Sequence, residues 1–264
     1  MNNYSISILL NQFSVKRLFE IFENKKNEVC LVGGCVRDAL LGKKTKDIDI
    51  AANIEPNKII RILEKNNIKY EDYAYKYGSI TAIIEDHKFQ ITTLREDINQ
   101  TGRHTNIIFT DSWKKDAQRR DFTINALYLN NEGIIKDFFK GQEHLKENRL
   151  EFIGNMEKRI QEDFLRIFRY YRFLGIFQNS RLINGYEEIL EYYCVESFKY
   201  LSNDLLRQEI LKMFHSSFSL NSFFKNKNNK EKRFWIKLTK DHFIKTHYAL
   251  GLNNCLNKID LLVN

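Results

Sequence analysis

The spacing of hydrophobic residues changes near residue 143 and divides the chain into two regions. Before this point, short apolar runs alternate with turn residues, which predicts a mixed sheet with helices. After it, apolar positions recur at helical spacing. The pattern therefore predicts an α+β head followed by an all-α C-terminal region. The expected parts cover 1–142, 143–215 and 216–264.

The apolar runs of the head also predict its individual elements. Pro56 suits the first turn of a helix, and Gly42 suits the residue that ends one. The polar stretch 95–113 lacks clear periodicity, which favours a mobile loop. The expected helices are 13–26, 36–41 and 57–64, and the expected strands are 28–32, 47–52, 79–85, 88–94, 125–129 and 133–139, with a hairpin turn at Asp86-His87.

Three helices are expected in the second region, at 155–177, 186–200 and 203–214. A run of lysine and asparagine follows at 225–233. We interpret this run first as a solvated loop or helix end, and second as a contact to an RNA backbone.

Composition narrows the class of partner. The chain has 264 residues, a net charge of +8 and a pI near 9.1, which favours a polyanion such as nucleic acid. Its four cysteines form no Cys-x-x-Cys pair, so zinc and redox motifs lack support and a reduced, cytoplasmic setting is expected. No apolar run is long enough to span a bilayer, so no membrane partner is expected.

The strongest chemical signal is a glycine turn followed by two carboxylates. Gly33 and Gly34 follow an expected strand, and Asp47 and Asp49 alternate on the next one. Alternate strand positions share a face, so the carboxylates can hold Mg²⁺ together while Ile48 points into the core. Backbone N–H groups at the turn suit a phosphate. The pattern indicates nucleotidyl transfer, the alternative being a structural turn with two surface aspartates.

Other phosphate-binding motifs do not fit the spacing of these glycines. The Walker loop requires a glycine five positions before its Gly-Lys pair, where this chain has Arg37. The dinucleotide fingerprint Gly-x-Gly-x-x-Gly is also absent from this stretch.

A second cluster lies at 119–126 and contains Arg120, Asp121 and Asn125. An arginine can clamp phosphate in a fork geometry, and a carboxylate can accept a hydrogen bond from a ribose hydroxyl. A surface ion-pair cluster is the alternative interpretation of Arg-Arg-Asp.

A third cluster places polar residues three apart on an expected helix, at Asp163, Arg166, Arg169 and Arg172. Cytosine and adenine both present an amine donor beside a ring-nitrogen acceptor. A carboxylate only accepts and a guanidinium only donates, so an Asp–Arg pair can satisfy C or A but leaves G or U mismatched. Each buried mismatch costs about 1–3 kcal/mol, which is roughly tenfold or more in selectivity. The alternative is a helix with surface Asp–Arg pairs over an aromatic core.

These clusters, in this order, resemble the tRNA nucleotidyltransferase and poly(A) polymerase family of the bacterial and eukaryotic type. The resemblance covers about 28–215 and is closest to CCA-adding enzymes of the alphaproteobacterial and mitochondrial kind. Residues 92–117 resemble the loop with which such enzymes switch from C to A. The matching segments are Leu31-Val32-Gly33-Gly34, Asp47-Ile48-Asp49, Arg119 to Ala126, Gly133 to Asp137, Glu162-Asp163-x-x-Arg166 and Leu201 to Glu209.

The resemblance implies a polymerase-β-like nucleotidyltransferase head that uses CTP, ATP and Mg²⁺ to add CCA to tRNA. It implies metal binding by Asp47 and Asp49, and triphosphate binding by Gly33, Gly34 and Arg37. Arg120, Asp121 and Asn125 would bind the nucleotide and its ribose. Asp163, Arg166, Arg169 and Arg172 would read the base, 143–215 would be the neck, and 216–264 a reduced RNA-binding body.

The chain is shorter than is usual in this family. We expect either a grip on a smaller part of the tRNA, or affinity that comes from a homodimer or from basic patches. Addition of only CC, only A or poly(A) remains an alternative, as does a catalytically inactive RNA-binding protein. The source compartment is expected to be the bacterial cytoplasm, with an organellar matrix as the alternative.

Overall fold

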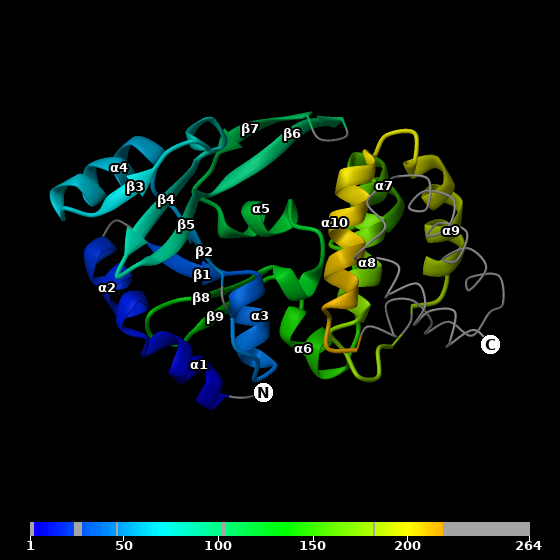
Figure 1. Cartoon of the computed structure of the whole chain (residues 1–264), viewed down its shortest axis with the longest axis horizontal. Coiled ribbons are helices and arrows are strands. Elements are labelled where there is room, and N and C mark those ends of the chain that lie inside the picture. The colour runs from blue at the N-terminus through cyan, green and yellow to red at the C-terminus, as the bar shows by residue number, and fades with distance from the viewer. Residues whose placement is uncertain (1–2, 24–27, 46, 102–103, 182, 219–264) are drawn as a thin grey trace. The chain divides into compact units, whose positions relative to one another are not determined.

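The computed structural model describes residues 3–23, 28–45, 47–101, 104–181 and 183–218 (Figure 1). Two compact units are present, one of residues 1–147 and 151–159 and one of 148–150 and 160–264. The first unit mixes strands and helices, and the described part of the second is helical. This confirms the predicted α+β class, while the three predicted boundaries stay a prediction.

A mixed seven-stranded sheet forms the centre of the first unit. Its strand order is β3-β4-β5-β2-β1-β8-β9, and β2 pairs in parallel with β5. The central strands β1 and β2 are largely buried because their apolar residues face the core. The strands are β1 (Val29–Val32), β2 (Ile48–Ala52), β3 (Lys69–Glu71), β4 (Ser79–Ile84), β5 (His87–Thr93), β8 (Leu127–Leu129) and β9 (Ile135–Asp137).

Helices of the first unit follow the predicted order. Pro56 begins its helix as expected, and Gly42, with φ of 71°, follows the end of another. The helix predicted at 13–26 ends at Phe22, and residues 24–27 lie outside the described part. The helices are α1 (Asn3–Leu10), α2 (Phe13–Phe22), α3 (Gly34–Leu40), α4 (Pro56–Lys65), α5 (Trp113–Gln118) and α6 (Gly141–Lys146), with 3₁₀ turns η1 (Tyr75–Tyr77) and η2 (Thr123–Asn125).

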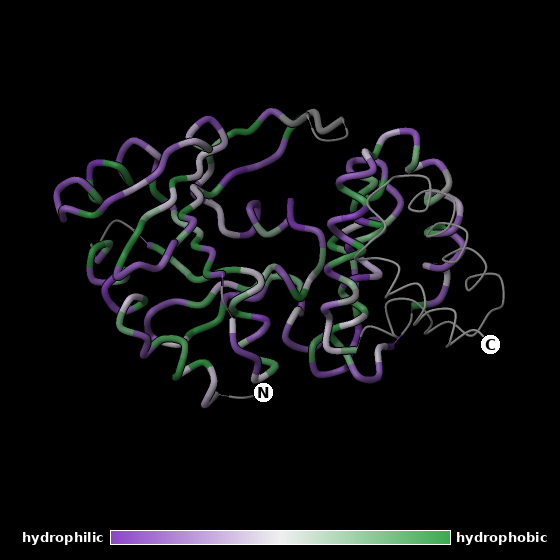
Figure 2. The backbone as a smooth tube through the Cα atoms, in the orientation of Figure 1, coloured by the Kyte–Doolittle hydropathy of each residue, from purple (hydrophilic) through white to green (hydrophobic). Residues whose placement is uncertain are grey.

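The prediction of a mobile loop at 95–113 was wrong. Strands β6 (Arg95–Thr101) and β7 (His104–Phe109) form an antiparallel ribbon separate from the main sheet, and α5 follows (Figure 1). Most of β6 is hydrophilic, as its colour shows in Figure 2. The less exposed positions of β6 are charged, since the side chains of Arg95 and Asp97 are only 18% and 12% exposed, so the alternation of apolar and polar residues that marks most strands is absent.

Two smaller boundaries also differ from the prediction. The β4–β5 turn is formed by Glu85 and Asp86, both with positive φ, because His87 already pairs with Ile84 in the ladder. The strand predicted from residue 125 begins at Leu127, after η2.

The prediction of a single helix over 155–177 was wrong, because the structure has two helices there. A break at Asp163 and Phe164 separates α7 (Met156–Glu162) from α8 (Leu165–Leu174). The Asp163 carboxylate accepts a hydrogen bond from the Leu165 N–H at 3.0 Å, which satisfies one of the free donors at the start of α8. Two further helices are α9 (Tyr186–Ser197) and α10 (Asn203–Phe214), as predicted, and the basic run 225–233 lies outside the described residues.

Cys30, Cys35 and Cys194 are buried free thiols, and Cys255 lies outside the described part. Burial raises the pKa of Cys30 and of Cys35 to about 12, so both stay protonated near neutral pH. Within the described residues, no helix has the length and apolar character to cross a membrane.

Candidate active site

The glycine turn lies between β1 and α3 and brings two motifs together. Gly33 has φ of 74°, which favours glycine, and its N–H donates to the Leu127 carbonyl oxygen at 3.1 Å. A Cβ added at Gly33 would lie 3.4 Å from Nη1 of Arg120 and 3.5 Å from the carbonyl oxygen of Asn125. The turn thus lies against the second sequence cluster.

Asp47 and Asp49 are both exposed, and Ile48 between them is 6% exposed. Asp49 lies in β2 opposite Val32 of β1 and Gln90 of β5. The burial of Ile48 confirms the prediction that it points into the core, which leaves the two aspartates on the accessible face.

The electrostatics around Asp49 are those of a partly desolvated carboxylate with charged neighbours. Loss of solvent contact raises the pKa of Asp49, Arg120 opposes this shift, and the negative charge of Asp47 adds to it. The described residues contain no group of three or more His, Cys, Asp and Glu side chains placed for a metal. A divalent cation held by this pair would therefore take further oxygen ligands from substrate and water, as Mg²⁺ usually does.

A chain of hydrogen bonds joins the first motif to the second. Nη1 of Arg37 donates to Oδ1 of Asn125 at 2.6 Å, and Nδ2 of Asn125 donates to Oδ1 of Asp121 at 3.0 Å. Nε of Arg37 donates to Asp38 at 2.9 Å. Arg37, Asp121 and Asn125 are each less than a tenth exposed, so their orientations are fixed.

Asp116 supports the arginines of the second motif, a role that the sequence interpretation missed. Its carboxylate accepts hydrogen bonds from Arg119 at 2.8 Å, from Arg120 at 3.3 Å and from the Tyr128 hydroxyl at 2.7 Å. Burial alone would raise the pKa of Asp116, but Arg120 and Arg119 hold this pKa below its usual range. The spacing of three and four residues to the arginines is the sequence signal that could have identified it.

A cavity of about 330 Å³ opens beside Asp49. Arg95, Arg119 and Arg120 contribute to its wall, and Gln90 lies next to Asp49 in the sheet. Strand β2 therefore borders a polar cavity rather than a closed core. Its lining is Val32, Asp49, Ile50, Ala74, Tyr77, Ser79, Gln90, Thr92, Arg95, Arg119 and Arg120.

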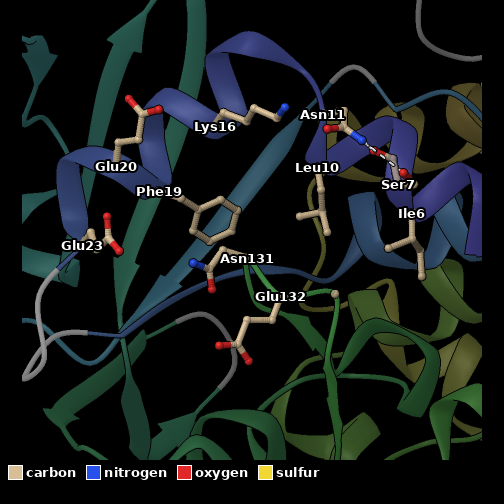
Figure 3. A pocket seen from close by; sticks show the side chains of 11 residues that line it. Ile6, Ser7, Leu10, Asn11, Lys16, Phe19, Glu20, Glu23, Asn131 and Glu132 are labelled. Atoms are coloured by element: carbon tan, nitrogen blue, oxygen red, sulfur yellow. Dashed lines mark hydrogen bonds between the residues drawn. The ribbon is translucent and has the colours of Figure 1, made fainter.

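A larger cavity of about 620 Å³ lies elsewhere in the first unit and contains no predicted site residue. Lys16, Phe19 and Glu20 of α2 line it, together with Glu23 just after this helix and the turn after β8 (Figure 3). Glu20 already pairs with Arg17 at 3.2 Å. The cavity beside Asp49 is therefore the better candidate for chemistry.

The predicted base-reading residues lie in the second unit, on α8 and just before it. Nη1 of Arg166 pairs with Oε2 of Glu162 at 2.6 Å, and Nε of Arg172 pairs with Oε2 of Glu209 at 3.0 Å. The guanidinium carbons of Arg169 and Arg172 lie 5.4 and 4.4 Å from the Phe173 ring centre. The carboxylate that pairs with Arg166 thus belongs to the last residue of α7, four positions earlier. The sequence interpretation missed Glu162 and Glu209 as partners of these arginines.

Comparisons with known proteins agree with this geometry. The human mitochondrial CCA tRNA nucleotidyltransferase 1 is 43% identical over 162 residues, which cover 61% of this chain and 37% of that protein. The Bacillus stearothermophilus CCA-adding enzyme in complex with CTP is similar in structure, with a TM-score of 0.70 and 26% identity over 80% of this chain and 51% of that one. The Thermotoga maritima CCA-adding enzyme complexed with tRNA_CCA has a TM-score of 0.68 and 26% identity, over 96% of this chain and 58% of that one.

This chain therefore spans well under two thirds of each of these relatives. Residues 29–151 match the family described as the poly A polymerase head domain. The nucleotidyltransferase head that the family resemblance implied is confirmed by this match and by the structural neighbours.

Proposed function

We propose that this protein adds CCA to the 3′ end of tRNA from CTP and ATP, without a template, by two-metal nucleotidyl transfer. The observation that carries the proposal is the pair of exposed carboxylates at Asp47 and Asp49, beside a polar cavity and close to the glycine turn. The names of the relatives, CCA tRNA nucleotidyltransferase and CCA-adding enzyme, support the choice of reaction.

The donor set fits a divalent cation, which we propose to be Mg²⁺. Asp47 and Asp49 are both exposed, and loss of solvent contact and the negative charge of Asp47 raise the pKa of Asp49, an effect that a bound cation would oppose. When bound, two such ions would activate the 3′-hydroxyl and neutralise charge on the triphosphate.

The residues around the aspartates would orient the nucleotide. The turn at Gly33 and Gly34 and the guanidinium of Arg37 would contact the triphosphate. The Gly33 N–H is bonded to the Leu127 carbonyl oxygen, so the N–H that the turn would offer is that of Gly34. Arg120 would hold the nucleotide, with Asp121 and Asn125 at its ribose, and the bonds among Arg37, Asn125 and Asp121 would align these groups before substrate arrives.

Residues of the second unit would select the bases C and A. Asp163 and Arg166 would read the base edge, and Arg169 and Arg172 would line the same pocket. The Arg166–Glu162 and Arg172–Glu209 pairs hold both guanidinium groups in place, which supports a fixed reading geometry.

How the chain holds tRNA belongs to the proposal as well. Its affinity would come from a grip on a small part of the tRNA, from a homodimer or from basic patches. Sedimentation of the protein with and without tRNA distinguishes a dimer from the other two. We place the reaction in a bacterial cytoplasm, with an organellar matrix as the alternative because the human relative is mitochondrial.

The test is nucleotide addition on a panel of RNAs. The full chain is incubated with Mg²⁺, CTP and ATP, and with tRNA ending before CCA, tRNA ending after CC, or an unrelated RNA. We expect a complete CCA on the first, one A on the second and no extension of the third. Addition of CC alone, of A alone or of poly(A) would assign one of the related activities, and absence of pyrophosphate release would indicate an inactive RNA-binding protein.

A further inference from the structure

One exposed aromatic ring lies in the wall of the cavity beside Asp49. Tyr77 is 46% exposed and lines this cavity from η1, the turn before β4. The Nζ of Lys76 lies 4.9 Å from the centre of the Tyr77 ring. An accessible ring with a cation beside it is the type of group on which nucleic-acid bases stack.

The backbone holds this ring in a defined place. Gly78, with φ of 74°, donates its N–H to the Tyr75 carbonyl oxygen at 2.8 Å and closes η1. Phe109 of β7 packs against Gly78, where an added Cβ would lie 2.5 Å from its ring. The Arg95 guanidinium donates to the Tyr77 carbonyl oxygen. The turn is thus fixed by both β6 and β7.

The order of strands separates two sides of Asp49. In β3-β4-β5-β2-β1-β8-β9, the glycine turn and Asn125 lie on the side of β1 and β8. The cavity begins on that side, at Val32, Arg119 and Arg120, and extends across β5 and β4 to Tyr77. If the triphosphate lies at the glycine turn and Arg120 holds the nucleotide, the part of the cavity lined by β4, β5 and Tyr77 remains for the other reactant, the RNA 3′ end.

The chemistry of the cavity suits an RNA strand. Its described lining contains three arginines, Arg95, Arg119 and Arg120, and one acidic residue, Asp49. The neighbouring hydroxyls of Ser79 and Thr92 lie 3.1 Å apart, and Gln90 is exposed. Guanidinium groups bind phosphates, and hydroxyl and amide groups bind ribose and base edges.

We infer that Tyr77 is a stacking platform for the base at the single-stranded 3′ end of the RNA, which it positions in the cavity beside Asp49. This inference rests on the proposed function and assigns the site of its acceptor. Stacking requires the aromatic face of the ring and not its hydroxyl. Tryptophan at position 77 should therefore preserve RNA binding, and alanine should weaken it.

The test measures equilibrium binding of tRNA ending before CCA, without nucleotide, to the full chain. We expect Tyr77→Ala to raise the Kd about tenfold, and Tyr77→Trp to keep it near that of the wild type. The matched control is Tyr4→Ala, which removes a ring that is 75% exposed on α1 and should leave the Kd unchanged. The same tRNA trimmed to a blunt acceptor end should bind Tyr77→Ala and wild type equally, because it has no unpaired base to stack.

Steady-state kinetics of nucleotide addition distinguish a defect in tRNA binding from a defect in CTP binding. We expect Tyr77→Ala to raise the KM for tRNA and to leave the KM for CTP unchanged. A Kd for tRNA that Tyr77→Ala does not change would overturn the inference, and so would an equal loss with the blunt RNA or a rise confined to the KM for CTP. Failure of the wild type to add nucleotides would reject the proposed function itself, and the binding measurement is independent of that result.

Discussion

Single residues decide the proposed chemistry, and Asp49 is the first of them. Its carboxylate lies in the cavity wall, where Arg120 lowers its pKa and Asp47 raises it. A group in this position is sensitive to loss of charge, because its proposed role is to bind a cation.

We expect Asp49→Asn to lower the rate of CTP incorporation by about 1000-fold or more, because loss of a metal ligand removes several kcal/mol of transition-state stabilisation. The matched control is Asp86→Asn, the same substitution at an exposed aspartate in the β4–β5 turn, which should retain wild-type activity. The measurement is single-turnover addition with Mg²⁺. Near-normal turnover of Asp49→Asn would contradict the metal assignment.

We expect Asp163→Ala to lower the preference for CTP over UTP roughly tenfold, since the proposed carboxylate acceptor for the base amine is lost. The ratio of kcat/KM values for the two nucleotides is measured on tRNA ending before CCA. Asp204→Ala, at an exposed position in the first turn of α10, is the control and should keep the preference. An unchanged ratio in Asp163→Ala would count against edge reading.

Asp116 should contribute to stability in a pH-dependent way. We expect Asp116→Asn to lower the free energy of unfolding by about 3–5 kcal/mol near neutral pH, because two arginines lose a buried partner. Since the pKa of Asp116 is lowered on folding, this contribution is present above the ordinary carboxyl value of 3.8 and is lost as the pH falls through the folded value. Urea unfolding of both proteins at a series of pH values gives the difference, and a difference that does not shrink in acid would refute the assignment.

At the scale of elements, the ribbon of β6 and β7 shows that the local hydrophobic pattern does not reveal every strand. Its strand β6 carries charge on both faces, including the pair of Arg95 and Asp97 at 3.6 Å, and Glu96 pairs with Lys115 of α5 at 3.0 Å. The residues of β6 that are largely buried are charged rather than apolar, so the sequence resembles a loop. By contrast, β1, β2, β4 and β5 were predictable because burial shapes their residues.

We expect Gly78→Ala to destabilise the protein by about 1–3 kcal/mol, because a side chain disfavours the positive φ at this position. The added Cβ would also lie 2.5 Å from the Phe109 ring. The double variant Gly78→Ala/Phe109→Ala removes the contact but not the backbone strain. Thermal unfolding of the two single variants and the double variant should therefore show a coupling between the sites, and strict additivity would contradict the packing of Phe109 on the turn.

At the scale of the whole molecule, net charge is the property that follows most directly from the sequence. The net charge of +8 and the arginines of the cavity both favour a polyanion. If three arginines contact phosphates, the affinity for tRNA should fall about 10- to 100-fold between about 50 and 200 mM salt. Binding titrations over this range check the value, and a salt-independent Kd would contradict an electrostatic grip.

The sequence by itself determined the class of fold, the glycine turn, the aspartate pair and the order of the motifs, because each depends on residues near one another in the chain. Only the tertiary structure decided that Arg37 reaches Asn125, 88 positions away, that Asp116 anchors Arg119 and Arg120, and that Tyr77 faces the cavity of Asp49. Strand order and the packing of distant segments create these contacts, and neither of them produces a periodic pattern in the local sequence.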